Sequence, residues 1–269
     1  MTTNIFDKVT LLITHYNRSK SLQHLFIRFA EEELHFEEII VSDDGSNEVH
    51  LSRLKELQQQ YAFTLITSSV NKGLGHNINK GQLSASKPFT LYVQEDFEPT
   101  AKFGAVLKQA VELIDQEPWD LIRFYSFPWA PFPLLQNYKF GFSEMKFKGL
   151  LTSWNHLKFR MYSDHPHLRR STFLDKFGPY LEGTTGDTTE YDMCMRFLSK
   201  GGKALIYEQN DLFLHEHHAF EPNTIKRKKW KLSNSPCIKL LRYLYLVVKV
   251  IRSTLQLEQA KTKELAPGT

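Results

Sequence analysis

Cysteines and long apolar runs are scarce in this 269-residue chain. Its two cysteines, Cys194 and Cys237, have the spacing of neither a disulfide framework nor a zinc motif, so we expect two reduced thiols. No run approaches the roughly 18 apolar residues that a membrane-spanning helix needs. The N-terminus lacks a basic segment followed by an apolar one, so we expect no secretory signal. These absences favour a cytoplasmic chain that is long enough for a sizeable core.

Charge is unevenly distributed along the chain. The formal net charge is +4, with 41% hydrophobic and 24% charged residues, which is ordinary for a globular protein. Between Asn223 and Leu257, however, there are nine Lys or Arg and no Asp or Glu. The other residues carry 25 basic and 30 acidic groups, so the body is mildly acidic and the tail strongly basic. This asymmetry predicts an anionic partner for the tail, either nucleic acid or a membrane surface.

Apolar and β-branched runs alternate with helical periodicity through the first half. Short connections between them predict an α/β domain with a largely parallel sheet and helices on both faces. Ser19 and Thr100 are the expected N-caps of two of the helices. Helical character returns at 168–177 and 190–199, and a late strand is expected at 204–207. The expected strands of the first half are 9–14, 39–41, 63–67, 89–93 and 121–125, and the expected helices are 20–33, 49–60, a short helix ending near 84, and 100–114.

Aromatic residues replace this periodicity between 126 and 168. Trp154, Phe159 and Tyr162 follow a run of Phe, Trp and Pro that starts at Phe127. Two interpretations stay open: ordinary packing of loops, or an aromatic surface on which sugar rings stack.

Acidic pairs follow two of the expected strands. Asp43 and Asp44 follow one strand by one residue, and Glu95 and Asp96 follow another by one residue. Open α/β sheets bind ligands at the carboxyl ends of their strands. Carboxylate oxygens suit Mg²⁺ or Mn²⁺ that bridges to phosphate oxygens. A solvated loop is the simpler alternative for each pair alone.

Three blocks in order give the chain a family resemblance. They are Thr14-His-Tyr-Asn-Arg18, then Val41-Ser-Asp-Asp-Gly-Ser46, then Asn71-Lys-Gly-Leu-Gly with Asn79-Lys-Gly81 and Gln94-Glu-Asp96. Together they resemble the inverting glycosyltransferases of family 2, which have the GT-A fold. The resemblance is firm over 9–98, weaker over 165–220, and ends near 225. It implies a GT-A (Rossmann-like) catalytic domain at 1–222, with a nucleotide-binding half at 1–98 and an acceptor-side half at 99–222, followed by a basic amphipathic helical tail at 223–269.

The resemblance also implies a nucleotide-sugar pocket. In the family the second acid of the first pair reads the base, which points to Asp44, and Tyr16 offers a face for base stacking. An Arg often precedes the Asn equivalent to Asn79, but Ile78 stands there in this chain, so that helix lacks the cation. The residues implied to bind the donor are Thr14, Tyr16, Arg18, Asp43, Asp44, Asn71, Gly73, Asn79 and Glu95.

Glu95-Asp96 stands where the family has its Asp-X-Asp motif. Asp96 matches the metal-binding acid, and the resemblance implies Mn²⁺ or Mg²⁺ as cofactor. His215, directly after an apolar run, matches a family His that contacts the metal or the diphosphate. The neighbouring His217 and His218 leave open a zinc site or a solvated loop.

Glu190 is the residue that the resemblance implies as the catalytic base. Aligning Asp192 and Arg196 with the family's last Asp and Arg puts Glu190 at the base position. Thr189 replaces the acid that normally precedes the base. A general base there would deprotonate the acceptor hydroxyl. The alternative is that Glu190 only interacts with the dipole of its helix.

The tail has its own pattern. Ser235-Pro236 can start a helix as N-cap and first residue. At 100° per residue, its four cations between 239 and 252 fall within an arc of about 140°. That pattern favours an anionic membrane surface. Packing on the body and a contact between subunits stay open, whereas the apolar content argues against nucleic acid.

These inferences predict a metal-dependent enzyme that moves a sugar from a nucleotide diphosphate to a hydroxyl, and the resemblance implies UDP as that nucleotide. The expected acceptor is a glycan or glycolipid at the inner face of a bacterial membrane, in surface polysaccharide synthesis. One rival is a nucleotidyltransferase, but the loop after the first strand has only Arg18 as a cation and no glycine. The other rival is a catalytically inactive, membrane-bound scaffold, which the missing acid at Thr189 keeps open.

Overall fold

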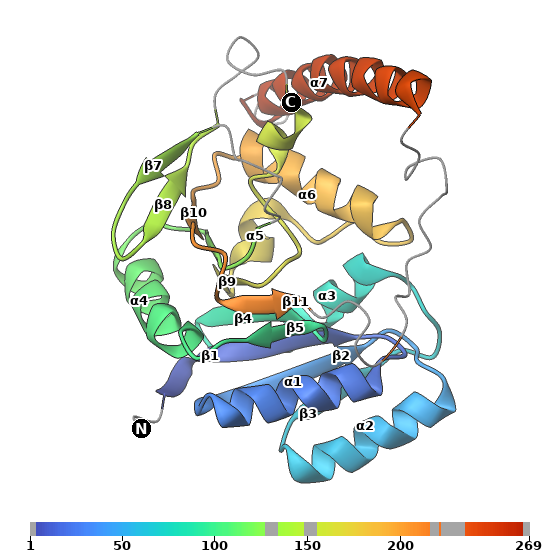
Figure 1. Ribbon diagram of the computed structural model, residues 1–269, viewed down its shortest axis with the longest axis vertical. Helices are drawn as coiled ribbons and strands as arrows, with labels where there is room; N and C mark the ends of the chain where they lie inside the picture. Colours follow the sequence, from blue (N-terminus) through green and yellow to red (C-terminus); the bar gives the residue numbers. More distant parts are fainter. Residues whose placement is uncertain (1–3, 127–133, 148–154, 216–220, 222–234, 266–269) are drawn as a thin grey trace.

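The computed structural model describes residues 4–126, 134–147, 155–215, 221 and 235–265 (Figure 1). Strands and helices alternate through its first half, as the periodicity predicts. In chain order the elements are β1 (Asn4–His15), α1 (Ser19–Glu31), β2 (Leu34–Asp43), α2 (Glu48–Gln60), β3 (Thr64–Thr67), α3 (Leu74–Leu83), β4 (Phe89–Gln94), β5 (Phe97–Pro99), α4 (Phe103–Gln116), β6 (Leu121–Arg123), β7 (Leu135–Asn137), β8 (Phe142–Met145), η2 (His156–Phe159), β9 (His167–Arg170), α5 (Phe173–Phe177), α6 (Gly186–Ser199), β10 (Ala204–Tyr207), β11 (Phe213–His215) and α7 (Pro236–Leu265).

The main sheet has the strand order β3-β2-β1-β4-β9-β6-β10-β8-β7. The four strands β3, β2, β1 and β4 run parallel to one another. β9 lies antiparallel between β4 and β6, and β8 and β7 extend the far edge in antiparallel fashion. The expected α/β fold with a mostly parallel sheet is therefore confirmed, and its antiparallel strands all come from the second half.

The prediction of helix from Leu168 to Phe177 was wrong at its first residues. His167–Arg170 forms the central strand β9, and only Phe173–Phe177 is helical. Arg169 is fully buried in this strand. Its Nε donates to Oε1 of Gln82 at 3.0 Å, and its Nη1 donates to the hydroxyl of Tyr180. Partners on other segments thus allow a charged residue to occupy the middle of a sheet.

Two predicted helix caps also differ. Arg18 occupies the N-cap position of α1, while Oγ of Ser19 lies 2.8 Å from Nδ1 of His50. Lys102 occupies that of α4, and Oγ1 of Thr100 donates to the carbonyl of Asp211 at 2.9 Å. Both hydroxyls bind groups distant in sequence instead of the first turn of their own helix.

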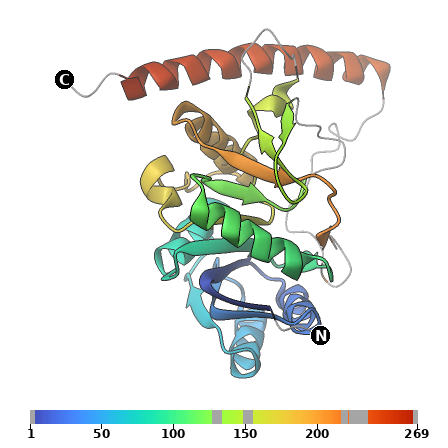
Figure 2. The ribbon, with the colours of Figure 1, turned by 90° about the vertical axis from the view of Figure 1, so that its left-hand side faces the viewer.

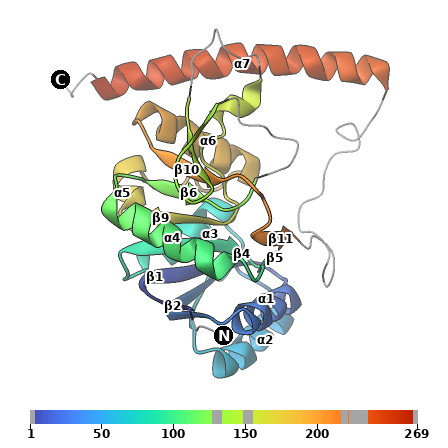
Figure 3. The same cartoon turned by 60° about the vertical axis from the view of Figure 1, so that its left-hand side comes forward.

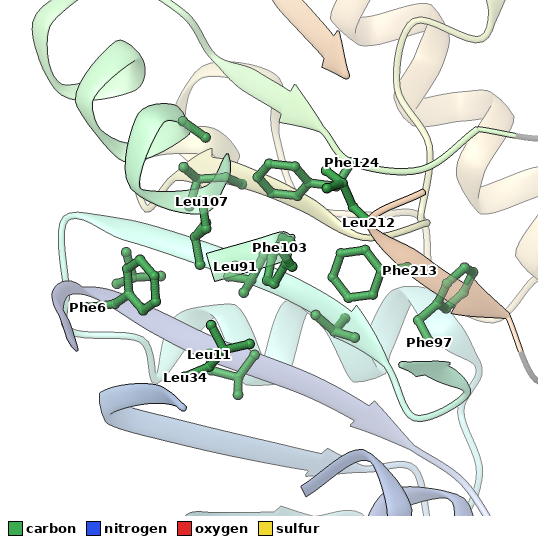
Figure 4. Close-up of a cluster of buried hydrophobic side chains, with 14 of the residues drawn as sticks. Phe6, Leu11, Leu34, Leu91, Phe97, Phe103, Leu107, Phe124, Leu212 and Phe213 are labelled. Atoms are coloured by element: carbon green, nitrogen blue, oxygen red, sulfur yellow. The ribbon is translucent and has the colours of Figure 1, made fainter. Parts of the chain in front are cut away.

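Helices cover both faces of the sheet, as predicted, because neighbouring strand residues point to opposite sides. Leu11 and Leu91 face α4 in the first core, which includes Phe103 and Leu107 (Figure 4). Leu12 belongs to the second core, which α3, α5 and α6 complete. Phe159 and Tyr162 are buried in that second core, which favours loop packing for these two aromatics. Trp154 and the run that starts at Phe127 lie outside the described residues.

The C-terminal helix α7 lies across the second half of the molecule (Figures 2 and 3). It begins at Pro236, as the sequence predicts, and it packs on α6 and η2. Val250 and Leu257 are buried in this contact. Among the described residues, no helix combines the length and the apolar character needed to cross a bilayer.

Candidate active site

The ends of β1, β2 and β4 are adjacent in the sheet, so the polar residues that follow these strands meet at one edge. A cleft of about 370 Å³ opens there. Ten of the residues implied by the resemblance line this cleft, which are Thr14, Tyr16, Arg18, Asp44, Asn71, Gly73, Glu95, Asp96, Glu190 and His215. The structure thus brings together residues that are up to 201 positions apart in the chain.

The carboxylates of Asp43 and Asp44 lie in different environments. Asp43 is fully buried and does not line the cleft. Its Oδ1 lies 2.7 Å from Nδ1 of His15, and the backbone N–H of Ser46 donates to Oδ2 at 3.0 Å. Burial alone would raise the pKa of Asp43, but the hydrogen bonds from His15 and Ser46 hold it below its usual value. Asp43 therefore shapes the loop that presents its neighbour.

Asp44 connects the end of β2 to the turn before α3. Its Oδ1 accepts the N–H of Lys72 at 3.0 Å, and its Oδ2 accepts the N–H of Gly73 at 2.8 Å. Gly73 has φ of 92°, a conformation that favours glycine. Burial raises the pKa of Asp44. Each oxygen keeps a second lone pair, so the carboxylate can accept a further hydrogen bond from a ligand in the cleft.

On helix α3, Asn77 lines the cleft and Asn79 does not. Nδ2 of Asn79 donates to the carbonyl of Tyr180 at 2.9 Å and to Oε1 of Glu182 at 2.8 Å. Its Oδ1 accepts the N–H of Tyr180 at 2.7 Å. In this structure Asn79 therefore connects the two halves of the domain, while Nδ2 of Asn77 donates to the carbonyl of His15 at 3.2 Å.

Asp96, Arg18 and His215 form a charged cluster at the end of β4. Nη1 of Arg18 lies 2.7 Å from Oδ2 of Asp96 and 3.4 Å from Oε1 of Glu95. The small antiparallel pair of β5 and β11 puts His215 opposite Phe97, and the two rings stack at 4.0 Å. Nε2 of His215 is thereby held 3.5 Å from Oδ2 of Asp96.

The two acids of this cluster have different electrostatics. Burial and the charge of Asp96 raise the pKa of Glu95 to about 8, although Arg18 opposes this. Burial alone would raise the pKa of Asp96 too, but the hydrogen bond to His215 and the charge of Arg18 lower it to about 2. Asp96 is therefore the carboxylate of the pair that stays ionised.

The Asp96 cluster fits a divalent cation that is shared with a ligand. Oδ1 of Asp96 is buried and has no hydrogen-bond partner among the described residues, so an acceptor is available. The described residues contain no group of three or more His, Cys, Asp or Glu arranged to hold a metal. Mg²⁺ commonly takes one or two protein carboxylates and completes its shell with phosphate oxygens and water. Asp96 and His215 are thus the candidate protein ligands of such a cation.

Glu190 also lines the cleft, from the first turns of α6. Its Oε2 accepts from Nη1 of Arg160 at 2.6 Å, and its Oε1 accepts from Oγ of Ser163 at 2.9 Å. Asp164, which also lines the cleft, is hydrogen-bonded to Glu190. Burial, the charge of Glu190 and this hydrogen bond raise the pKa of Asp164 well above its usual value. The Glu190 carboxylate is therefore held by Arg160 and Ser163, next to a second carboxyl whose pKa is raised.

Asp192 and Arg196, which fixed the alignment of this helix, form a pair outside the cleft. Nη2 of Arg196 lies 2.6 Å from Oδ2 of Asp192. Nη1 of Arg196 also donates to the carbonyl of Phe177 at 2.6 Å. The pair thus attaches α6 to the end of α5.

Sequence reasoning missed several residues that line the cleft. Gln94 and Asn77 lie inside the quoted blocks, where their polar character was a usable signal. Arg160, Asp164 and His165 come from the loop between η2 and β9, where no periodicity or motif marks them.

The model of the family described as "Glycosyl transferase family 2" matches residues 10–178. The chain belongs to this family. The match spans more than half of the chain and includes the ends of β1, β2 and β4, whereas Glu190 and His215 lie beyond it. The chain accordingly contains a domain of glycosyl transferase family 2.

Several known proteins are similar to this chain in sequence or in structure. A poly-β-1,6-N-acetyl-D-glucosamine synthase of Staphylococcus epidermidis is 26% identical over 114 residues, which cover 37% of this chain and 28% of that protein. The structure of S. aureus TarS 1–349 in complex with UDP-GlcNAc superposes with a TM-score of 0.59 at 16% identity, over 96% of this chain and 71% of that one. The mannosyltransferase PcManGT from Pyrobaculum calidifontis, in complex with GDP-Man and Mn²⁺, gives 0.56 at 13%, over 98% and 77%.

Proposed function

We propose that this chain is a metal-dependent, inverting glycosyltransferase that uses a UDP-sugar and a hydroxyl acceptor. The observation that carries the proposal is the arrangement of one cleft. Asp44 and the Asn71–Gly73 turn line it together with the Asp96 cluster and Glu190. The reaction needs a nucleotide pocket, a diphosphate site and a base within one cavity.

The nucleotide would bind along Thr14, Tyr16 and Asp44. The remaining lone pairs of the Asp44 carboxylate can accept the N3–H of uracil, and the Tyr16 ring offers an apolar face to the base. The turn at Asn71 and Gly73 lies next to Asp44 because its N–H groups bind that carboxylate. UDP-GlcNAc and GDP-Man in the two neighbouring structures support a nucleotide diphosphate as the donor type.

Asp96 and His215 would hold Mn²⁺ or Mg²⁺ beside the diphosphate. The bound cation supplies a Lewis acid that neutralises negative charge on the leaving UDP. Arg18 is close enough to share this role, because its guanidinium already contacts Asp96 and Glu95. Mn²⁺ in the PcManGT complex supports the choice of metal.

Glu190 would act as the general base. As the acceptor oxygen bonds to the anomeric carbon, the O–H bond breaks and its proton passes to the Glu190 carboxylate. The bond between the anomeric carbon and the phosphate oxygen breaks, and its electron pair leaves with UDP. A single displacement of this kind inverts the anomeric centre. Arg160 and Ser163 hold the carboxylate in place for this transfer.

The acceptor would be a glycan or a lipid-linked glycan at the inner face of the cytoplasmic membrane. The similarity to a poly-N-acetylglucosamine synthase supports polysaccharide synthesis as the setting. The chain spans only 28% of the length of that relative, so the relative's product does not define the acceptor of this chain. The acceptor is therefore a separate proposal.

A screen of nucleotide sugars tests the proposal. We expect at least one UDP-sugar to raise the melting temperature in the presence of Mn²⁺ and not in EDTA, because a ligand that binds only the native state stabilises it. The same donor should release UDP on incubation with enzyme. Donor binding without any UDP release, with or without glycan acceptors, would identify the inactive scaffold. Release of pyrophosphate from nucleoside triphosphates would identify the nucleotidyltransferase.

A further inference from the structure

Helix α7 presents two different faces. The face toward the body includes Val250, Ser253 and Leu257, which are all buried. The hydroxyl of Tyr191 on α6 donates to Oγ of Ser253 at 2.7 Å and to Oε1 of Gln256 at 2.9 Å. These contacts fix the rotation of the helix about its axis, and they therefore determine which residues point away from the body.

The face turned away from the body is apolar. At 100° per residue its large side chains fall within an arc of about 100°, centred roughly 160° from the buried face. They extend over 16 residues, a rise of about 22 Å along the helix. These side chains are 43–65% exposed, and we call them the outer face, which consists of Leu240, Leu241, Leu244, Val248, Ile251 and Leu255. Beyond Leu255 the same side of the helix carries Glu258, Gln259 and Thr262 and is polar.

Cations follow one another around the helix from the edge of the outer face toward the body. Arg252 lies at the edge of that face, followed around the helix by Lys249, Arg242 and Lys239. Nζ of Lys249 lies 5.6 Å from the centre of the Tyr191 ring, so this cation faces the body. No acid occurs anywhere between Asn223 and Leu257. The segment that carries the outer face is thus strongly basic, with Arg252 at the edge of that face and the other cations closer to the body.

We propose that the outer face of α7 inserts into the headgroup layer of an anionic lipid membrane. A helix with one apolar side and cations along its border lies in the membrane interface, and Lys and Arg there bind anionic headgroups. The described helices are too polar to span a bilayer, which fits a helix that lies on the surface. A second copy is a poorer occupant, because pairing would bring two acid-free, strongly basic segments together.

Membrane binding through α7 would orient the active site. Tyr191, which binds α7, directly follows Glu190, so the helix that carries the proposed base rests on the membrane-binding helix. Figures 2 and 3 show α7 at the same end of the molecule as α6. The proposed base would therefore lie on the half of the protein nearest the lipid surface, where a lipid-linked acceptor is held. The membrane contact itself rests on α7 alone and is independent of the donor site.

Vesicle binding with outer-face variants tests the proposal. The probe is a set of vesicles of phosphatidylcholine with 30% phosphatidylglycerol, compared with pure phosphatidylcholine, at a stated salt concentration. We expect the full chain to bind the anionic vesicles, and Leu240→Gln/Val248→Gln to bind at least about ten-fold more weakly, since each lost apolar insertion costs a similar factor. The control is Val49→Gln/Leu83→Gln, which removes two comparably exposed apolar side chains from the body and should bind normally.

A charge variant tests the electrostatic part. Lys239→Gln/Arg252→Gln removes two exposed cations from α7, and Lys55→Gln/Lys108→Gln removes two from the body. We expect only the first to weaken binding to anionic vesicles by about ten-fold or more and to reduce its salt dependence. UDP binding should be unchanged in every variant, so a failure of the donor site is recognised separately.

Three results would overturn the membrane proposal. The first is that the full chain does not bind anionic vesicles at low salt. The second is that the outer-face variant binds them as tightly as the parent protein. In the third, the parent protein forms a dimer by sedimentation, the outer-face variant is monomeric, and neither binds vesicles. That last result would assign the outer face to a second copy of the chain.

Discussion

Nη1 of Arg18 and Oδ2 of Asp96 are 2.7 Å apart, so the acid at the proposed metal position is already paired with a protein cation. The second oxygen of Asp96 is buried and has no hydrogen-bond partner among the described residues. The pairing explains how a buried carboxylate stays ionised without metal, and the remaining oxygen explains how the same residue can still accept one.

Asp96→Asn tests the metal position. The amide keeps the shape of the side chain but loses its charge, so UDP binding should no longer depend on Mn²⁺. Calorimetric titration of UDP in Mn²⁺ and in EDTA measures this. Asp115→Asn removes a surface carboxylate that is paired with Lys8, and it should behave like the parent protein. Retention of Mn²⁺-dependent affinity by a folded Asp96→Asn protein would move the metal site elsewhere.

Asp164→Asn should change the pH dependence of stability. An unfolded Asp has a pKa of about 3.9, whereas burial and the neighbouring Glu190 raise the pKa of Asp164 in the folded protein. Above pH 4 the folded state therefore holds a proton that the unfolded chain has lost, and stability falls as pH rises toward the folded pKa. Asn is neutral at every pH and avoids this loss.

The difference in melting temperature between Asp164→Asn and the parent protein should therefore be more favourable to the variant at pH 8 than at pH 5. Asp115→Asn is again the control, and its difference should lack this upward trend. A difference for Asp164→Asn that is constant with pH, or that declines as pH rises, would show that Asp164 is not held protonated beside Glu190.

Gly75→Ala tests the close contact between the two halves of the domain. A Cβ at Gly75 would lie 2.2 Å from the carbonyl oxygen of Leu181, and both of these are backbone positions with little freedom to move. We expect a loss of roughly 1–3 kcal/mol, typical of overpacking, measured by denaturant unfolding. Gly186→Ala is the control, because its Cβ would meet Cδ2 of Leu74 at an ordinary 3.6 Å. Equal stabilities for the two variants would contradict this packing.

The parallel half of the sheet was predictable because its strands contain runs rich in apolar residues that are followed by polar residues. Adjacent acids at a strand end look equivalent in sequence, yet Asp43 is buried against His15 while Asp44 lines the cleft. The strand period predicts that neighbouring side chains point to opposite sides, but it does not indicate which of the two acids faces the cleft.

The remaining parts depend on contacts between distant segments. Gln82 and Tyr180 bind the guanidinium of Arg169, which allows this residue to occupy a central strand. The residues near Arg169 in sequence do not indicate these partners. Arg160 and Asp164 join the site through a loop without periodicity. In the second half of the site only Glu190 and His215 were predicted, and the residues that orient Glu190 needed the structure.

The most direct test of the account measures donor binding and UDP release on the same preparation of Glu190→Gln. The amide cannot accept a proton, so we expect normal binding of the UDP-sugar in Mn²⁺ and turnover that is slower by roughly 10²–10⁴. Asp192→Asn changes an acid on the same helix outside the cleft and should keep parental turnover. Parental turnover in Glu190→Gln, with chemistry rate-limiting, or no UDP-sugar binding by the parent protein in Mn²⁺, would contradict the central claim.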